Sequence, residues 1–352
     1  MKKYKIILII LLFIIMIIVF KSFFSNENYI NIKLNKHGYN KEEIKLIINK
    51  LNTDKINYLL KIPYNKSYSK IINNKDFKNK NLIKYINYYK KYKAPINDTI
   101  FLINNNIESK YNPKLINLIN EKFYKKNNYK RYYNYLIKHN DLSTKEIISM
   151  VNCNRDFNFY STNYKSDLNK GILMIANKYY TLDNFEPKNL VNITSEYGGN
   201  NFYIQDIAFE NYKKMYNDIK KENLKIIIKS AYRSYQYQNK IYNNYVKKDG
   251  KTLADTYSSR PGFSDHQTGL AIDIGTNTTI NLEDFENTLE YKWMIKNAHK
   301  YGFILRYPKN KENLTGYMFE SWHYRYVGTN VATYIKNHDL TFDEYYEYYL
   351  NN

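Results

Sequence analysis

The distribution of apolar and polar residues sets the N-terminal end of the chain apart from the remainder. Residues 6–20 form an almost unbroken apolar run, preceded by three lysines within residues 2–5. A core helix is rarely apolar on every side, so the run predicts one N-terminal transmembrane helix. Basic flanks stay in the cytoplasm, which would place the remainder outside it. Neither a small-residue cleavage site nor a cysteine for lipidation follows, so we expect residues 1–27 to be an uncleaved single-pass anchor.

A helical periodicity dominates residues 28–170, which contain almost no turn glycine. Within this region, Phe77–Tyr88 resembles Phe123–Tyr135. Each stretch is followed, after a loop, by an apolar run that ends in asparagine, at Asn104 and at Asn152. The pattern predicts a diverged repeat of paired helices that stack on one another.

Residues 171–200 contain a proline and paired glycines, which predict a linker. From residue 201 onward, strand-like and helix-like patterns alternate. Helices are expected at 210–222, 235–246 and 288–301, and strands at 224–230 and 269–274. We therefore predict one domain of strands and helices over residues 201–352.

Composition narrows the possible functions only slightly. The 352 residues allow an anchor and two compact units, at ~150 residues per domain. The formal charge of +21 and the 41 tyrosines fit the codon bias of an A/T-rich genome. Because the basic residues are spread along the whole chain, no nucleic-acid partner is expected, although salt-dependent DNA binding would revive that hypothesis. Cys153 is the only cysteine, so any metal must be held by histidines and carboxylates.

Two of the six histidines lie close in sequence to carboxylates: His266 is near Asp273, and His323 is near Glu320. A zinc hydrolase needs three protein ligands and one open position, and two imidazoles with one carboxylate meet this need. A carboxylate outside the coordination shell must accept the proton of the attacking water, and Glu320 is the candidate. Arg233, between a strand and a helix, is the candidate cation for stabilising an oxyanion.

The spacing of these residues leaves simpler alternatives open. Either histidine, taken alone, could be a surface residue or a packed structural residue. In a straight strand, Glu320 and His323 would face opposite sides, as would His266 and Asp273, because both separations are odd. A joint site therefore requires the backbone to bend, with Gly269 permitting a kink.

Three motifs in order resemble one known family. Ser264–Asp273 matches the pattern Ser-x-His-x-x-Gly-x-Ala-x-Asp, and Glu320–His323 matches Glu-x-Trp-His. Ser230–Gln238 matches the segment that carries the family's arginine. Together they resemble the VanY-type D-alanyl-D-alanine carboxypeptidases of peptidase family M15, whose fold is shared with lysostaphin-type peptidases and the Hedgehog domain. The resemblance extends over residues 177–349, and it implies an α+β domain over residues 201–352 with a small antiparallel sheet and flanking helices.

This resemblance implies a Zn²⁺-dependent carboxypeptidase that removes the C-terminal D-alanine from the peptide stems of peptidoglycan. The implied metal ligands are His266, Asp273 and His323. Glu320 is implied as the catalytic base and Arg233 as the carbonyl stabiliser, while Ser264 and Gln238 would bind substrate near the terminal D-alanine. Two departures from the family pattern, Ala231 in place of Gly and Asp265 in place of Glu, touch no implied ligand.

The motifs leave the exact reaction open. An L,D-carboxypeptidase acting on tetrapeptide stems and a D,D-endopeptidase acting on cross-links both remain alternatives. An inactive cell-wall-binding protein is an alternative of a different class, although the intact set of ligands, base and arginine argues against it. The expected partners are stem peptides and, through the N-terminal helix, the membrane. The helical region is expected to be a spacer or a wall-binding module.

Overall fold

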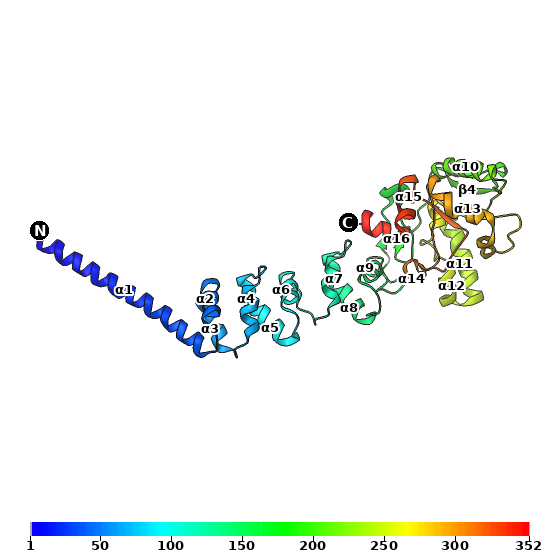
Figure 1. The fold of residues 1–352 in the computed structure, drawn as a ribbon. Helices are drawn as coiled ribbons and strands as arrows, with labels where there is room; N and C mark the ends of the chain where they lie inside the picture. Colours follow the sequence, from blue (N-terminus) through cyan, green and yellow to red (C-terminus); the bar gives the residue numbers. More distant parts are fainter. Residues whose placement is uncertain (1, 163, 352) are drawn as a thin grey trace. The chain divides into compact units, whose positions relative to one another are not determined.

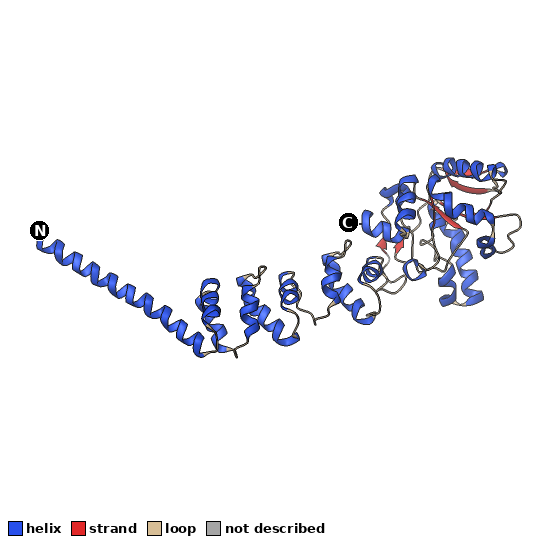
Figure 2. Ribbon diagram, in the orientation of Figure 1, coloured by secondary structure: helices blue, strands red, loops and turns tan. Residues whose placement is uncertain are grey.

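The structure, a computed structural model, describes residues 2–162 and 164–351, with the backbone alone for residues 2–9, 20 and 22–27. The chain folds into two compact units, Met1–Asn120 and Glu121–Asn352. Figure 2 shows helices and loops in the first unit, while every strand assigned in the described residues belongs to the second. The boundary at residue 120 differs from the predicted division at residue 170.

Helix α1 (Lys2–Lys36) contains the apolar run at the N-terminal end (Figure 1). The large apolar side chains from Ile10 to Val19 are all exposed, each by 42% or more. None of the helices in the described residues is both long and apolar enough to cross a membrane, so the predicted transmembrane helix is not supported. The run lies between Lys5 and Lys21 and is shorter than the ~20 residues that a span needs. The predicted basic flank lies outside the described side chains.

The rest of the first unit consists of short helices. They are α2 (Lys41–Lys50), α3 (Thr53–Lys61), α4 (Lys66–Asn73), α5 (Leu82–Tyr92), α6 (Ile96–Asn104) and α7 (Lys114–Asn120). Asparagine starts several of them: Asn40 forms a capping box with Glu43, and Asn52 and Asn65 cap the next two helices. The apolar faces of α2 to α5 share one buried cluster that includes Ile47 and Ile86.

The two stretches predicted as a repeat make the same hydrogen bonds. In each copy, an asparagine at the end of the second helix accepts from a tyrosine hydroxyl and from another asparagine, and donates to a main-chain oxygen that precedes the first helix. These groups are Asn104, Tyr85, Asn81 and Asp76 in the first copy, and Asn152, Tyr132, Asn128 and Phe123 in the second. The tyrosine–asparagine distances are 2.6 and 2.5 Å. The structure thus aligns Asp76 with Phe123 and Phe77 with Tyr124, one position away from the alignment drawn from sequence, which paired Phe77 with Phe123.

The second copy, with helices α8 (Tyr129–Lys138) and α9 (Thr144–Asn152), packs against the C-terminal end of the chain within the second unit. The ring of Phe123 stacks on Tyr348, with centroids 3.8 Å apart. The hydroxyl of Ser149 lies 2.6 Å from that of the same tyrosine. These contacts between distant segments explain why the boundary falls at residue 120.

The segment predicted as a linker, 171–200, is instead built into the second unit. Residues 174–182 are all buried. Strand β1 (Tyr164–Lys165) pairs with β2 (Tyr180–Thr181), and β3 (Leu190–Ile193) pairs with β4 (Phe202–Gln205). The proline and glycine content was misleading because these short strands find their partners through the fold and not through local periodicity.

A four-stranded antiparallel sheet forms the centre of the second unit, and this confirms the predicted α+β fold. Its order is β5 (Ile227–Ser230), β6 (Ala271–Gly275), β8 (His323–Tyr326) and β7 (Phe303–Leu305). The helices of the second unit after residue 200 are α10 (Asp206–Lys221), α11 (Tyr235–Asp249), α12 (Lys251–Tyr257), α13 (Leu289–Asn297), α14 (Glu312–Thr315), α15 (Thr329–His338) and α16 (Phe342–Tyr345). Apolar residues of β6, such as Ile272 and Ile274, share a buried core with Met215 of α10 and Met294 of α13. This core fixes the sheet on which the site is built.

Candidate metal centre and active-site cavity

The register of the central sheet brings two of the predicted metal ligands together. Asp273 on β6 pairs directly with His323, the first residue of β8. On the other side, Asp273 pairs with Ser230 at the end of β5, three residues before Arg233. Residues that are far apart in sequence therefore meet at one place on the sheet.

A tight turn supplies the bend that the odd spacing of His266 and Asp273 requires. His266 lies on the 3₁₀ turn η5 (Asp265–Thr268) and not on the strand. Gly269 ends this turn with φ +67°, a left-handed conformation that favours glycine. A Cβ atom at residue 269 would meet Leu190 Cδ2 at 2.9 Å, so a larger residue would also require the Leu190 side chain to shift. The turn begins at Ser264, whose hydroxyl accepts from the main-chain N–H of His266.

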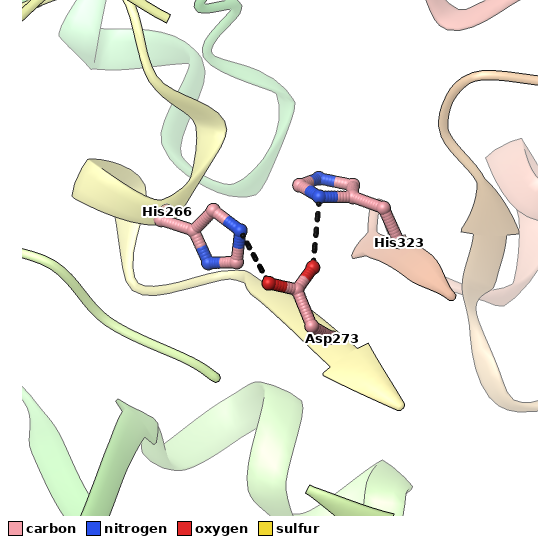
Figure 3. A group of neighbouring side chains, drawn as sticks. All are labelled: His266, Asp273 and His323. Carbon is pink, nitrogen blue, oxygen red and sulfur yellow. Dashed lines mark ion pairs between the residues drawn. The ribbon is translucent and has the colours of Figure 1, made fainter. Parts of the chain in front are cut away.

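Figure 3 shows His266 and His323 directed at the carboxylate of Asp273. His266 Nε2 lies 3.3 Å from Asp273 Oδ2, and His323 Nδ1 lies 3.1 Å from Asp273 Oδ1. One ligand atom from each residue lies within 4.8 Å of the other two. Tetrahedral zinc with bonds of ~2.0–2.1 Å separates neighbouring donor atoms by about 3.3 Å. The three residues are therefore close enough together to share one ion.

The electrostatics of His266 and Asp273 also fit a metal. All three are buried, and Asp273 Oδ1 has no hydrogen-bond partner in the part of the chain that the structure describes. Burial, with the nearby Arg233 guanidinium, lowers the pKa of His266 to about 4, so its imidazole is neutral at pH 7. Although burial alone would raise it, the two histidines and Arg233 hold the pKa of Asp273 well below its usual value. Neutral imidazole and ionised carboxylate are the forms that bind zinc.

Contacts behind the ligands orient both rings. His266 Nδ1 lies 2.7 Å from the main-chain oxygen of Ala231, which leaves Nε2 to face Asp273. The ring of His323 packs against that of Tyr307, with centroids 5.0 Å apart. Each histidine therefore presents a different ring nitrogen to the centre.

Glu320 lies beside the three residues, in the loop that precedes β8. Its Oε2 atom is 3.5 Å from His323 Nδ1, and its main-chain N–H donates to Tyr307. Because it stands before the strand, the odd separation from His323 does not place the two side chains on opposite faces. Burial raises the pKa of Glu320 to about 7. A carboxyl with this pKa can both accept and return a proton near neutral pH.

Arg233 follows β5 and is held on two sides. Its Nη2 donates to Asp273 Oδ2 at 2.8 Å, and its Nε donates to Ser230 Oγ at 2.9 Å. The guanidinium keeps further N–H groups for a ligand, since arginine carries five. About a fifth of the side chain is exposed, at the wall of the cavity described next.

These groups line one cavity with a volume of about 460 Å³. All seven residues predicted for the site, Arg233, Gln238, Ser264, His266, Asp273, Glu320 and His323, belong to its lining. Gln238 is 1% exposed, and its Nε2 already donates to the main-chain oxygen of Ser259. The structure thus brings the predicted set together, while the roles of the individual residues stay predictions.

Comparisons with known proteins identify the family to which this chain is similar. Residues 201–329 match the family described as VanY, D-alanyl-D-alanine carboxypeptidase. The putative carboxypeptidase YodJ of Bacillus subtilis (strain 168) is 42% identical over 186 residues, which cover 51% of this chain and 68% of YodJ. A D-alanyl-D-alanine carboxypeptidase of Enterococcus faecium is 32% identical over 186 residues, which cover 50% of this chain and 57% of that protein. Among solved structures, the LdcB LD-carboxypeptidase aligns with 53% of this chain and 91% of its own, at 39% identity and a TM-score of 0.49.

The chain belongs to the VanY family of D-alanyl-D-alanine carboxypeptidases. As a VanY-family protein it is a carboxypeptidase and a zinc metallopeptidase. The donor set of the cavity, two imidazoles and one carboxylate, is consistent with that ion.

Behind the site, this VanY-family protein contains a buried network of charges that the sequence did not reveal. Asp265 accepts from Arg306 Nε at 2.8 Å and from Arg325 Nη1 at 2.6 Å, and Arg306 also pairs with Asp343. The side chains of Asp265, Arg306 and Arg325 are fully buried. Arg325 donates further to the main-chain oxygen of Met174, in the segment predicted as a linker. Asp265, Arg306, Arg325 and Asp343 come from segments that are distant in the sequence, so no local pattern could have linked them.

Proposed function

We propose that this VanY-family protein is a D,D-carboxypeptidase that hydrolyses the last peptide bond of pentapeptide stems and releases D-alanine. One observation supports it above all others. The donor atoms of His266, Asp273 and His323 converge in a cavity that also contains a carboxyl of raised pKa and a guanidinium. The matching family and the Enterococcus faecium relative are both D-alanyl-D-alanine carboxypeptidases.

In this proposal His266 Nε2, an oxygen of Asp273 and His323 Nδ1 hold zinc. When bound, the ion lowers the pKa of water and polarises the carbonyl group that is attacked. The network behind them fixes the backbone on both sides, because Asp265 adjoins His266 and Arg325 lies on β8 with His323. The ligands are thereby preorganised.

Glu320 moves the proton. Its carboxylate accepts a proton from the attacking water as the oxygen–carbon bond forms, and it then donates that proton to the leaving nitrogen as the carbon–nitrogen bond breaks. The pKa of about 7 suits both steps near neutral pH.

Arg233 stabilises the negative charge that develops on the carbonyl oxygen. The bonds to Ser230 and Asp273 fix the plane of the guanidinium, so little reorganisation is needed when the charge forms. Ser264 and Gln238 lie in the wall of the same cavity, and we assign them to the terminal D-alanine.

The experiment incubates zinc-loaded protein separately with muramyl pentapeptide and tetrapeptide and follows the loss of D-alanine by mass. Chelator-sensitive loss from the pentapeptide is expected. Loss from the tetrapeptide alone would assign L,D-carboxypeptidase activity instead. Release from neither peptide, with zinc shown to be bound, would contradict the proposal and favour cross-link cleavage or a wall-binding role.

We propose further that the protein works outside the cytoplasm at a membrane, held there by the N-terminal segment. The support is the row of exposed apolar side chains from Ile10 to Val19. Exposure of these side chains to water is unfavourable, whereas contact with lipid is favourable. The full chain should sediment with membranes and be cleaved by external protease, while a chain without residues 1–27 should stay in the supernatant. A full-length protein in the soluble fraction would contradict this proposal.

A further inference from the structure

One lysine inside the second unit is buried without a carboxylate partner. Lys178, in the segment that the sequence predicted as a linker, is 1% exposed. No carboxylate in the described residues lies within ion-pair distance of its ammonium. Burial of a charge is expensive unless its donors are satisfied, so this position requires an explanation.

The ammonium joins two separate segments of the chain. It donates to the main-chain oxygens of Asp255 and Gly316. The rings of Phe159 and Tyr317 cover it, with their centroids 4.3 and 4.2 Å from Nζ. Carbonyl oxygens and aromatic faces both stabilise a cation, so together they replace the missing carboxylate.

Both segments are walls of the active-site cavity. Asp255 belongs to α12, and the residues that follow, 257–259, line the cavity on one side. Gly316 begins the loop 316–320, whose residues Tyr317, Met318 and Glu320 line another part. Lys178 itself is not part of the lining.

Few other bonds connect the two walls. The hydroxyls of Ser259 and Tyr317 lie 2.8 Å apart, and the main-chain N–H of Met318 donates to Thr256 over a long 3.4 Å. The ring of Tyr317 also packs against Tyr307, with centroids 4.7 Å apart, and Tyr307 accepts from the main-chain N–H of Glu320. A shift of the loop 316–320 would therefore move Glu320.

We propose that Lys178 is a positioning residue that clamps the loop 316–320 to α12 and so fixes Glu320 relative to the metal ligands. The clamp acts through main-chain oxygens and ring faces, so it requires an N–H donor at the end of a long side chain and nothing from the substrate. This inference rests on the proposed function only in assigning a catalytic role to Glu320.

The test compares Lys178→Met, which keeps the length of the side chain and removes its donors, with Lys178→Gln, which keeps an N–H donor. Lys178→Met should lower kcat ~10- to 100-fold, because a shift of about 1 Å in a catalytic group has effects of this size. Zinc affinity should be unchanged, because Lys178 touches no ligand. The amide hydrogens of residues 316–320 and 255–259 should exchange faster, and those of β6 should not. Lys178→Gln should recover part of both effects.

Ile335→Ala is the matched control, since Ile335 is buried in α15 and does not line the cavity. It should lower stability and leave kcat unchanged at a temperature where all variants are folded. Unchanged kcat and exchange in Lys178→Met would refute the clamp, and so would an equal loss of kcat in Ile335→Ala. If Lys178→Met does not fold, Lys178→Gln takes its place. A lower kcat and faster exchange than in the wild type would then support the clamp, and wild-type values of both would refute it. A wild-type protein that releases no D-alanine would contradict the proposed function alone, because the exchange comparison still tests the clamp.

Discussion

Replacing Asp265 by Asn tests whether the buried charges behind the site determine the stability of the second unit. The asparagine preserves the shape of the side chain and removes its charge. Its amide oxygen can accept from one arginine, but its NH₂ group must face the N–H groups of the other. In the variant, Arg306 still forms its ion pair with Asp343. Arg325 loses its ion pair, because Asp265 is the only carboxylate paired with it in the described residues.

Loss of one partner from a fully buried ion pair costs about 3–5 kcal/mol in the free energy of unfolding. For a unit of this size, the corresponding drop in Tm is roughly 6–20 °C. The matched control is Glu286→Gln, whose partner Lys309 is mostly exposed. That change should cost less than about 1 kcal/mol.

The assay can observe the second unit selectively, because both tryptophans of the chain, Trp293 and Trp322, lie in it. Urea unfolding followed by tryptophan fluorescence, with chelator present, separates the network from any effect of metal binding. A loss in Asp265→Asn no larger than in Glu286→Gln would refute the argument that this charge is essential.

Three other changes follow from the geometry. Glu320→Gln should lower kcat by about 10²- to 10⁴-fold with zinc affinity retained, measured by D-alanine release and zinc titration; full activity in a folded, zinc-loaded variant would contradict the role of Glu320. Gly269→Ala should destabilise the second unit by about 1–2 kcal/mol or more, because φ is positive and Leu190 is close; an unchanged urea midpoint would contradict this. Burial lowers the pKa of Lys178 to about 7. Above pH 7 the unfolded chain therefore binds more protons than the folded chain. The free energy of unfolding of the wild type should rise from pH 7 toward pH ~10 relative to that of Lys178→Met. Urea unfolding measured across this pH range checks this, and an equal pH dependence in the two proteins would contradict it.

The sequence indicated which residues lie together at the candidate site because they fall in short motifs with characteristic spacing. His266, Asp273, Glu320 and His323 lie together as the motifs implied. The odd separation of His266 and Asp273 does not place them on opposite faces, because Gly269 lets the chain turn before β6. Such a turn is a local property, and local properties are readable from sequence.

Features that depend on contacts between distant segments were not predictable. Lys178 and Asn177 look like loop residues in the sequence, yet both are buried. Asn177 donates to Asp343, a partner far along the chain that no periodicity indicates. The boundary between the two units was missed for the same reason, because the packing of Phe123 on Tyr348 is visible only in the folded chain.

The repeated asparagine has a consequence for how this protein can change in length. In the described residues, the side chains of Asn104 and Asn152 bond to groups of their own helix pair and its leading turn. A copy inserted as a whole would keep these bonds, whereas a partial copy would leave its asparagine without them. This freedom applies to helix pairs of the first unit, because Phe123 and Ser149 tie the second copy to Tyr348 and its removal would break those contacts.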